Sequence, residues 1–320
     1  MALPLTFVGV DVSKAWLDVW TGAAPHPHRL ANDDASWAEL ARLLAALGPP
    51  AGVVVAFEAT GGYERGLREA LLRAGYDARL LNPLRVRLFA RSIGRQAKND
   101  RIDARVIAHD ARVAETRPER LDAQQERLAE LVQHRRRLVE ERVAVANQAG
   151  LLRQDRLKAH HEARLALIAR QIAETERLIG AAVGEVPGLA DKVALLKSMK
   201  GIQDLTAVTL LALMPELGRL TGRAAAALAG LAPFDHDSGK RKGTRCIGGG
   251  RAPVRTALYM AARAAARSKS PLGAFYQRLI SGGKTSRVAT VALMRKMLVT
   301  ANAILRDGTK WSHAQAAKAV

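Results

Sequence analysis

The sequence has 320 residues, with 50 Lys and Arg against 30 Asp and Glu, and a formal net charge of +20. That length is enough for two domains, and the charge favours a polyanionic partner, because each neutralised phosphate releases counterions. A merely soluble basic surface is the alternative. A membrane surface is weaker, since no basic amphipathic helix with an aromatic face stands out, no apolar run approaches transmembrane length and no cationic leader precedes the first strand. The single cysteine, Cys246, permits no intrachain disulfide and fits a reducing cytoplasm.

Residues 1–115, the first of three predicted domains, alternate strands and helices. A hairpin comes first, and a nearly all-apolar strand over Gly52–Glu58 is typical of a central position in a covered sheet. The other predicted elements are the hairpin strands Leu5–Val12 and Ala15–Trp20, helices over Asp33–Leu47 and Tyr63–Ala74, and a strand over Ala78–Leu81. This order is expected of a ribonuclease-H-like, RuvC-like sheet. A doubly wound nucleotide-binding fold would need a glycine-rich turn after its first strand, where Asp11–Lys14 stands instead.

Residues 116–184 predict long helices, the second domain. We call Leu131, Leu138, Val145 and Leu152 the leucine row; its members recur every seventh residue, as in a coiled coil. The companion row begins with Leu121 and Leu128 and then meets Arg135 and Arg142. A solvated helical spacer and a paired-helix arm that carries a dimer contact both fit this pattern.

Residues 185–320, the third domain, predict short helices and glycine loops, giving an overall fold class of α/β plus α. Ser198–Ile202 followed by Thr206–Leu213 resembles half of a helix-hairpin-helix, in which a glycine turn presents backbone N–H groups to a phosphate. A plain core hairpin explains the same residues equally well.

Four carboxylates are the candidate catalytic and metal-binding residues. Asp11 and Glu58 end two apolar strands, and Asp100 and Asp103 are three residues apart, hence on one face if their segment is helical. Buried carboxylates are costly without a nearby cation, and oxygen ligands suit Mg²⁺ or Mn²⁺, which activate a nucleophile and stabilise a leaving oxygen in phosphoryl transfer. Taken singly, each acid is equally well a helix cap, a surface acid or an ion-pair partner.

Basic residues surround both candidate regions and predict contacts to a nucleic-acid backbone. The predicted nucleic-acid-binding residues are Arg91, Arg95, Lys98, Lys240, Arg241, Lys242 and Arg251. In the glycine-rich segment Gly230–Arg251, glycines allow close approach to a phosphate, and Ser238 is a candidate nucleophile. A serine between Asp and Gly is more often a turn residue.

Four motifs in order, FVGVDVSK, VVVAFEATGGY, KNDRIDA and GLAPFDHDSGKRKGTRCIGGGRAPVRTALYMAA, resemble the insertion-sequence transposase family numbered one hundred and ten, whose members are also called bridge-RNA-guided recombinases. The resemblance implies a RuvC-like domain, a coiled-coil arm and a C-terminal transposase domain. It also implies catalysis by Asp11, Glu58, Asp100 and Asp103, with Ser238 as nucleophile. One departure is Asn99, where the family commonly has threonine.

The resemblance implies a DNA transposase or recombinase that forms a phosphoserine, acts on donor and target double-stranded DNA and is guided by a structured RNA. We expect a homo-oligomer, dimer or tetramer, in the cytoplasm beside the nucleoid, with Ser238 and the carboxylates acting across a subunit interface. A Holliday-junction resolvase would use the same carboxylates with water as nucleophile. A non-catalytic nucleic-acid-binding protein would explain the charge and leave the strand-end acids unexplained.

Overall fold

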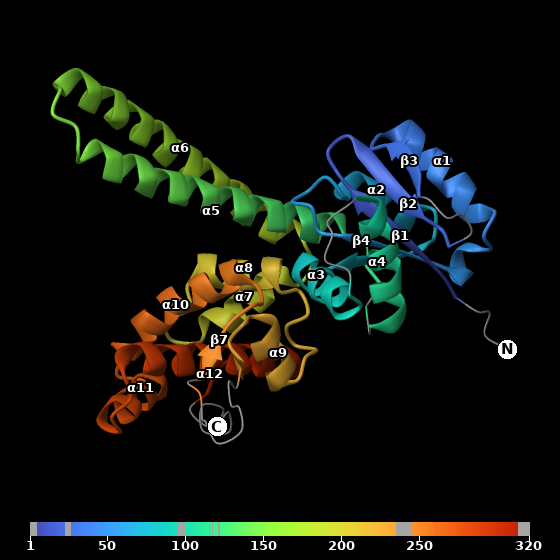
Figure 1. The fold of residues 1–320 in the computed structure, drawn as a ribbon. Coiled ribbons are helices and arrows are strands. Elements are labelled where there is room, and N and C mark those ends of the chain that lie inside the picture. Colours follow the sequence, from blue (N-terminus) through green and yellow to red (C-terminus); the bar gives the residue numbers. More distant parts are fainter. Residues whose placement is uncertain are drawn as a thin grey trace. The chain divides into compact units, whose positions relative to one another are not determined.

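A computed structural model describes residues 5–22, 27–94, 100–114, 116, 118–120, 122–234, 243 and 245–312, without the side chains of residues 100–102. The chain forms two compact units, residues 1–121 and 122–320 (Figure 1). The fold is a mixed α/β unit followed by a helical unit. The division into three domains at residues 115 and 184 stays a prediction.

A five-stranded sheet in the order β3-β2-β1-β4-β5 forms the centre of the first unit. Its strands are β1 (Thr6–Val12), β2 (Trp16–Trp20), β3 (His28–Ala31), β4 (Val53–Glu58) and β5 (Asp77–Leu81). β1, β2 and β3 pair antiparallel, whereas β4 pairs parallel with both β1 and β5. This arrangement is compatible with the ribonuclease-H-like order expected from the sequence. Strand β3 has no counterpart among the predicted strands, because its four residues are too short to show a clear alternation.

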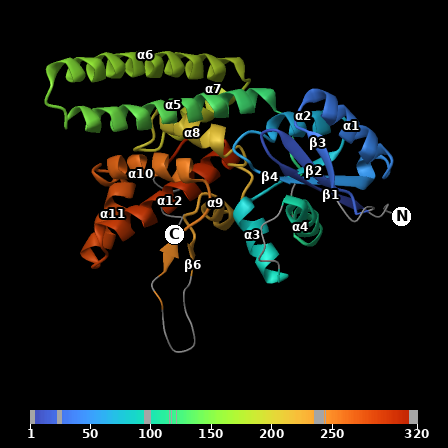
Figure 2. The same ribbon diagram turned by 45° about the horizontal axis from the view of Figure 1, so that its top comes forward.

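Helices cover both faces of this sheet (Figure 2). Val8, Val10 and Val12 of β1 pack with α1 (Asp34–Ala45) and α2 (Arg65–Arg73). The opposite face packs against α3 (Pro83–Ser92) and α4 (Asp100–Val113). A short 3₁₀ turn over Pro50–Gly52 leads into β4. Because successive strand residues point to opposite faces, alternate positions of β1 belong to different cores.

Side-chain caps define where two of these helices begin. Asp33 precedes α1 and accepts a hydrogen bond from the Ser36 amide at 2.9 Å. Asn82 accepts from the Leu84 amide at 2.9 Å, and Pro83 occupies the first position of α3. Each cap satisfies amides that have no partner inside the helix.

The second unit begins with a helical hairpin of α5 (Ala123–Ala149) and α6 (Asp155–Glu185), which run side by side in Figures 1 and 2. Leu138 and Val145 of the leucine row pack against Ile168 and Ile172 of α6. Arg135, which interrupts the companion row, pairs with Glu176 across the hairpin at 2.8 Å. Further ion pairs between the two helices are Arg127–Glu185 and Arg164–Glu141.

The leucine row belongs to a paired-helix arm that forms within one chain, and a dimer contact carried by this arm stays a prediction. The two central members of the row are buried against α6 of the same chain, and Leu131 packs on the core of the second unit. The 27-residue helix α5 pairs with the next helix in the chain because the five-residue connection between them makes the entropy cost of loop closure small.

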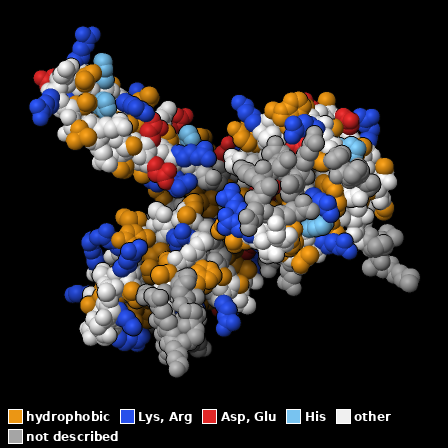
Figure 3. Space-filling view, in the orientation of Figure 1, with side chains coloured by type: hydrophobic (Ala, Val, Ile, Leu, Met, Phe, Trp, Pro, Cys, Tyr) orange, Lys and Arg blue, Asp and Glu red, His pale blue; other side chains and the backbone are white. Residues whose placement is uncertain are grey.

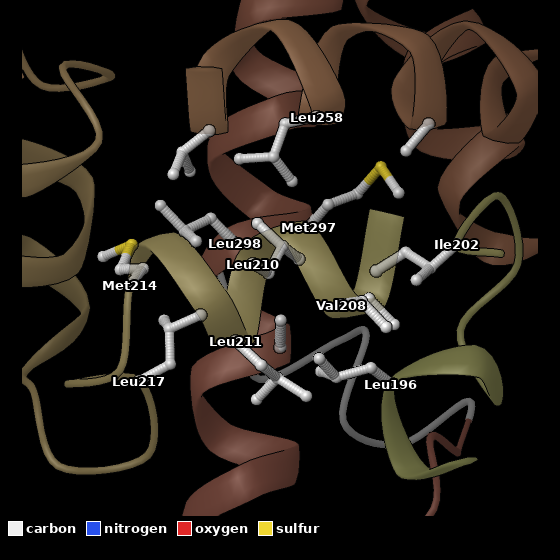
Figure 4. Close-up of a cluster of buried hydrophobic side chains, with 14 of the residues drawn as sticks. Leu196, Ile202, Val208, Leu210, Leu211, Met214, Leu217, Leu258, Met297 and Leu298 are labelled. Atoms are coloured by element: carbon white, nitrogen blue, oxygen red, sulfur yellow. The ribbon is translucent and has the colours of Figure 1, made fainter. Parts of the chain in front are cut away.

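The rest of the second unit packs short helices around α12 (Ser286–Asp307). The other elements are α7 (Leu189–Lys197), α8 (Asp204–Leu213), α9 (Gly222–Leu228), β6 (Pro233–Phe234), β7 (Cys246–Ile247), α10 (Ala252–Ala266) and α11 (Pro271–Ser281). Figure 4 shows Leu210 of α8, Leu258 of α10 and Leu298 of α12 in one apolar cluster; all three are fully buried.

Helix α12 also corrects the expectation that no apolar run reaches transmembrane length. By length and composition it is apolar enough to cross a membrane. Leu293, Met297 and Ala301 are, however, completely buried inside the second unit. A helix surrounded by other helices is apolar on most sides, which explains its composition without a bilayer.

Candidate active site

Asp11 lies on the α4 face of the sheet, near the end of β1. Val10 and Val12 point into the core with α1 and α2, so Asp11 points to the opposite face with Gly9. Its side chain is partly buried. A carboxylate in this position is only partly hydrated, and its charge therefore depends strongly on its neighbours.

Glu58 ends the adjacent parallel strand on the same face. Val10 of β1 pairs with Phe57 of β4, so the next step of the register brings Glu58 beside Asp11. The loop that follows is held by Glu64, whose carboxylate accepts hydrogen bonds from the Thr60 hydroxyl at 2.7 Å and the Gly62 amide at 2.9 Å. The end of β4 is thus tied to the start of α2.

Helix α4 brings Asp103 to the same face, and Gly9 makes this approach possible. A Cβ atom at Gly9 would lie 1.9 Å from the carbonyl oxygen of Ala104 and 2.7 Å from the amide nitrogen of Ala108. The backbones of β1 and α4 are therefore in direct contact. Glycine within a strand often marks such a close approach, and this signal in the sequence was not used.

Asp100, the fourth predicted acid, begins α4, but its side chain lies outside the described residues. Helical backbone from Asp100 onward places it one turn before Asp103, on the same side of the helix. The metal-binding role of all four acids stays a prediction. In the part of the chain whose side chains the structure describes, no group of three or more His, Cys, Asp or Glu is arranged to hold a metal ion.

The electrostatics of this face suit a cation. Partial burial, followed by the negative charges of Asp11 and Asp103, raises the pKa of Glu58 to about 7. Arg87 of α3 acts in the opposite direction and is outweighed. The carboxylates are therefore close enough to repel one another, and a divalent cation with oxygen ligands would relieve that repulsion. Carboxylate oxygens are the ligand type that Mg²⁺ and Mn²⁺ prefer, and the binding of such a metal by these acids stays a prediction.

Asp18 is a further acid on this face that the sequence analysis did not identify. It is the cross-strand partner of Asp11, and partners in an antiparallel pair project to the same side. Its buried carboxylate accepts two hydrogen bonds from Arg29 of β3, at 2.9 and 2.8 Å. The Asp18–Arg29 ion pair links β2 to β3, and it places one acidic and one basic side chain beside Asp11.

The structure describes some of the predicted nucleic-acid-binding residues and not others. Arg91 is exposed on α3, whereas Arg95 and Lys98 lie outside the described residues. Arg85, which lies in α3 with Arg91, donates hydrogen bonds to the buried Asp110 at 3.1 and 2.8 Å. Arg85 therefore fastens α3 to α4, and nucleic-acid binding by Arg91 stays a prediction.

Around the candidate serine, the structure describes only the flanks. Ser238, Lys240, Arg241 and Lys242 lie outside the described residues. Strands β6 and β7, which flank these residues, pair antiparallel, with Phe234 opposite Cys246. The role of Ser238 stays a prediction.

The described part of the glycine-rich segment has packing roles. The guanidinium of Arg251 donates two hydrogen bonds to Glu216, each of 2.7 Å, and one to the Leu213 carbonyl at 2.9 Å. A Cβ at Gly250 would lie 2.2 Å from the amide nitrogen of Gly230, so these glycines let two chain segments cross. The charge of Arg251 is largely matched by Glu216, and its binding to nucleic acid stays a prediction.

The half helix-hairpin-helix also has a packing role. A Cβ at Gly201 would lie 2.5 Å from the carbonyl oxygen of Ala261 in α10, and Met199 and Ile202 are buried. The glycine turn thus faces a neighbouring helix. This arrangement favours the core-hairpin alternative over phosphate binding.

We predict that Gly9→Ala disturbs the site. The new methyl group would collide with the Ala104 carbonyl and push α4 from β1, at a cost of about 1–3 kcal/mol in the free energy of unfolding. Urea denaturation measures this loss. The matched control is Gly180→Ala in α6, where no atom lies within 4 Å of the added Cβ, so stability should stay equal or rise. Equal stability of both variants and wild type would contradict the close approach.

We also predict a pH-dependent effect of Glu58→Gln in metal-free buffer with EDTA. The folded protein retains the Glu58 proton up to about pH 7, whereas the ordinary pKa is 4.5. The carboxyl therefore destabilises the fold increasingly as the pH rises between these values. Glu58→Gln should raise the thermal unfolding midpoint at pH 8 by roughly a few degrees and leave it nearly unchanged at pH 4. Exposed Glu39→Gln is the control, and the same pH profile in both variants would refute the raised pKa.

Comparison with known proteins identifies the family. Residues 8–154 match the DEDD transposase family of IS110 elements, and residues 193–277 match the transposase IS116/IS110/IS902 family. Pilin gene-inverting proteins of Moraxella lacunata and Moraxella bovis are each 24% identical over 325 residues, covering 94% of this chain and 96% of the relative. The acidic face of the sheet lies within the first match, and α8, α9 and α10 lie within the second. The chain belongs to the IS110 family of transposases.

Proposed function

We propose that this transposase cuts and rejoins DNA strands at a metal site formed by Asp11, Glu58, Asp100 and Asp103. The observation that carries the proposal is the shared face of β1, β4 and α4, where burial, and then the negative charges of Asp11 and Asp103, raise the pKa of Glu58 to about 7. Structural acids are normally neutralised, as Asp18 is by Arg29. Repelling carboxylates at strand ends are instead typical of functional sites. A ribonuclease-H-like, RuvC-like domain is part of this proposal and is supported by the strand order.

The metal is proposed to be Mg²⁺ or Mn²⁺, which supplies charge for activating a nucleophile and stabilising a leaving oxygen. The carboxylate oxygens of the four acids would hold it. Glu58 must lose its proton to bind, because the protonated carboxyl carries no charge. Gly9 positions α4, and with it Asp100 and Asp103, against β1. Arg87, whose charge acts to lower the pKa of Glu58, would offset part of the negative charge of the acids while the metal is absent.

Ser238 is the proposed nucleophile. Its hydroxyl oxygen would attack a DNA phosphorus and the bond from phosphorus to the 3′ oxygen would break, leaving a phosphoserine and a 3′-hydroxyl that takes up the proton. A 3′-hydroxyl attacking the phosphoserine would reverse the step and reseal a strand without ATP. The support is the family resemblance of the segment around Ser238, together with the pairing of β6 and β7, the strands on either side of it.

The proposal includes a structured guide RNA, a homo-oligomer and double-stranded donor and target DNA, in the cytoplasm beside the nucleoid. The charge of +20 supports polynucleotide binding. The two relatives are named pilin gene-inverting proteins, and the inversion of a gene is a DNA rearrangement. A resolvase-like nuclease that uses water is the second candidate, since the acidic site serves either nucleophile.

The test of this function uses a labelled DNA junction with Mg²⁺. We expect Asp11→Asn to retain DNA binding and lose strand cleavage by at least about 100-fold, because metal binding loses one charge. We expect wild type to yield a denaturation-resistant protein–DNA adduct and Ser238→Ala to yield none. Ser281→Ala, at the end of α11, is the matched control and should retain adduct formation. Full cleavage by Asp11→Asn would refute the metal site, and cleavage without an adduct would favour the resolvase.

A second prediction concerns the guide RNA. Protein purified with its RNA should recombine donor and target DNA, and the same protein after RNase treatment should not. Adding back the co-purified RNA should restore recombination, whereas an unrelated RNA of equal length should not. Recombination by protein shown to be free of RNA would refute the guide.

A further inference from the structure

The positive charge of this chain is concentrated near its C-terminus. Residues 238–306 contain 15 Lys or Arg and no Asp or Glu, whereas the formal net charge of the whole chain is +20. This segment holds α10, α11 and all of α12 except its last residue, Asp307. A run of this length without acids is unlike an ordinary solvated surface, on which both signs alternate and neutralise one another.

A polar cavity of about 400 Å³ lies between these three helices. Arg263 and Tyr259 of α10, Arg267 at its end, Tyr276 of α11, and Ser286 and Thr290 of α12 line it. A neighbouring cavity of about 560 Å³ shares Arg267 and Gln277 and continues past Ser268 to the start of α11. The two cavities together form what we call the α10–α12 groove. Figure 3 shows Lys and Arg side chains gathered over the α10 and α11 region.

The groove offers the donors that a phosphate needs. Arg263 and Arg267 are exposed, and among the described residues neither forms an ion pair with a carboxylate. The hydroxyl groups of Tyr276 and Ser286 are hydrogen-bonded to each other at 2.9 Å, so one of their protons stays available to an acceptor. Guanidinium and hydroxyl donors in a polar hollow match the oxygens of a phosphodiester.

Other arginines of the segment serve the fold, which sets the groove pair apart. Arg251 pairs with Glu216, and Arg306 pairs with Asp307. Arg255 donates to the carbonyls of Ala229 and Gly249. Arg263 instead lies with its guanidinium 5.9 Å from the ring centre of Tyr259, which steadies it while its N–H groups stay accessible.

The cation buried beneath α11 adds to the potential of this region. Lys296 of α12 is nearly inaccessible, and its ammonium lies 4.9 Å from the ring centre of Phe275. Burial, and then the charge of Arg278, lowers the pKa of Lys296. The neighbours acting on Lys296 are thus an aromatic ring and another cation. An approaching polyanion would relieve this crowding of positive charge.

We propose that the α10–α12 groove binds the phosphodiester backbone of a nucleic acid, with Arg263 and Arg267 as the principal contacts. The inference rests on the proposed function, because it assigns one surface to the polynucleotide on which that function depends. The backbone can belong to RNA or to DNA. Tyr259, which is 43% exposed at the edge of the groove, can stack on an unpaired base and would favour a single strand.

The test measures binding alone, so that it is independent of catalysis. Full-length protein carrying Asp11→Asn, free of nucleic acid and in EDTA, is titrated against three labelled 20-nucleotide probes, namely single-stranded RNA, single-stranded DNA and duplex DNA. Adding Arg263→Gln and Arg267→Gln should weaken binding by about 10-fold or more. The slope of log affinity against log salt should fall by about 1–2, since up to two phosphate contacts are lost.

The matched control is Arg170→Gln with Arg177→Gln, which removes the same charge from exposed positions of α6. It should change affinity by less than about threefold. Arg263→Lys with Arg267→Lys keeps both charges and should preserve the salt slope, which guards against loss of folding as the cause.

A loss of affinity for one probe identifies the type of strand that the groove binds, and a loss of affinity for all three probes supports a general backbone contact. Equal losses for the groove pair and the control pair, or no loss at all, would overturn the proposal. Because no cleavage is needed, this result stands apart from failure of the metal site.

Discussion

The backbone contact between strand β1 and helix α4 is the constraint on which the candidate active site depends. Only a glycine at position 9 permits it, because the carbonyl of Ala104 occupies the space where a Cβ atom would stand. This contact brings Asp103 to the sheet face that carries Asp11 and Glu58. A strand residue without a side chain is ordinarily a weakness in a sheet, and here it allows a helix to approach a row of acids.

The acids of this face illustrate two ways of keeping charge near a core. Asp18 and Asp110 are buried, and each is held by an arginine, Arg29 and Arg85 respectively. Glu58 is partly buried beside the negative charges of Asp11 and Asp103, and its pKa rises to about 7. The first arrangement pairs each buried carboxylate with a cation. The second leaves an electrostatic penalty that ligand binding could remove, and this difference separates structural acids from candidate catalytic ones.

The two units carry opposite electrostatic features. The first concentrates carboxylates on one sheet face, and the second carries an acid-free segment that includes α10, α11 and α12 as far as Arg306. In the second unit, α12 and the short helix α8 are buried on most sides. Helices α10 and α11 keep exposed faces on which arginines such as Arg263 and Arg278 lie.

Much of the first unit follows from the sequence alone. Alternation and apolar runs located β1, β2, β4, β5 and the helices α1 and α2 to within a few residues, since these signals are local. The motifs also indicated the transposase family, which the comparisons confirmed. Strand β3 was missed because its pairing with β2 depends on a neighbour more than on its own four residues.

Tertiary structure decided what each repeated or charged pattern is used for. The leucine row is equally suited to any apolar helix, and only the fold shows that α6 of the same chain covers it. The glycines at 201, 230 and 250 suit phosphate approach as well as chain packing, and the fold uses them for packing. The same holds for arginine, since sequence cannot tell Arg251, held by Glu216, from Arg263, which faces the groove. Sequence thus determined the residue types, and the partners of those residues, which lie far away along the chain, were decided by folding.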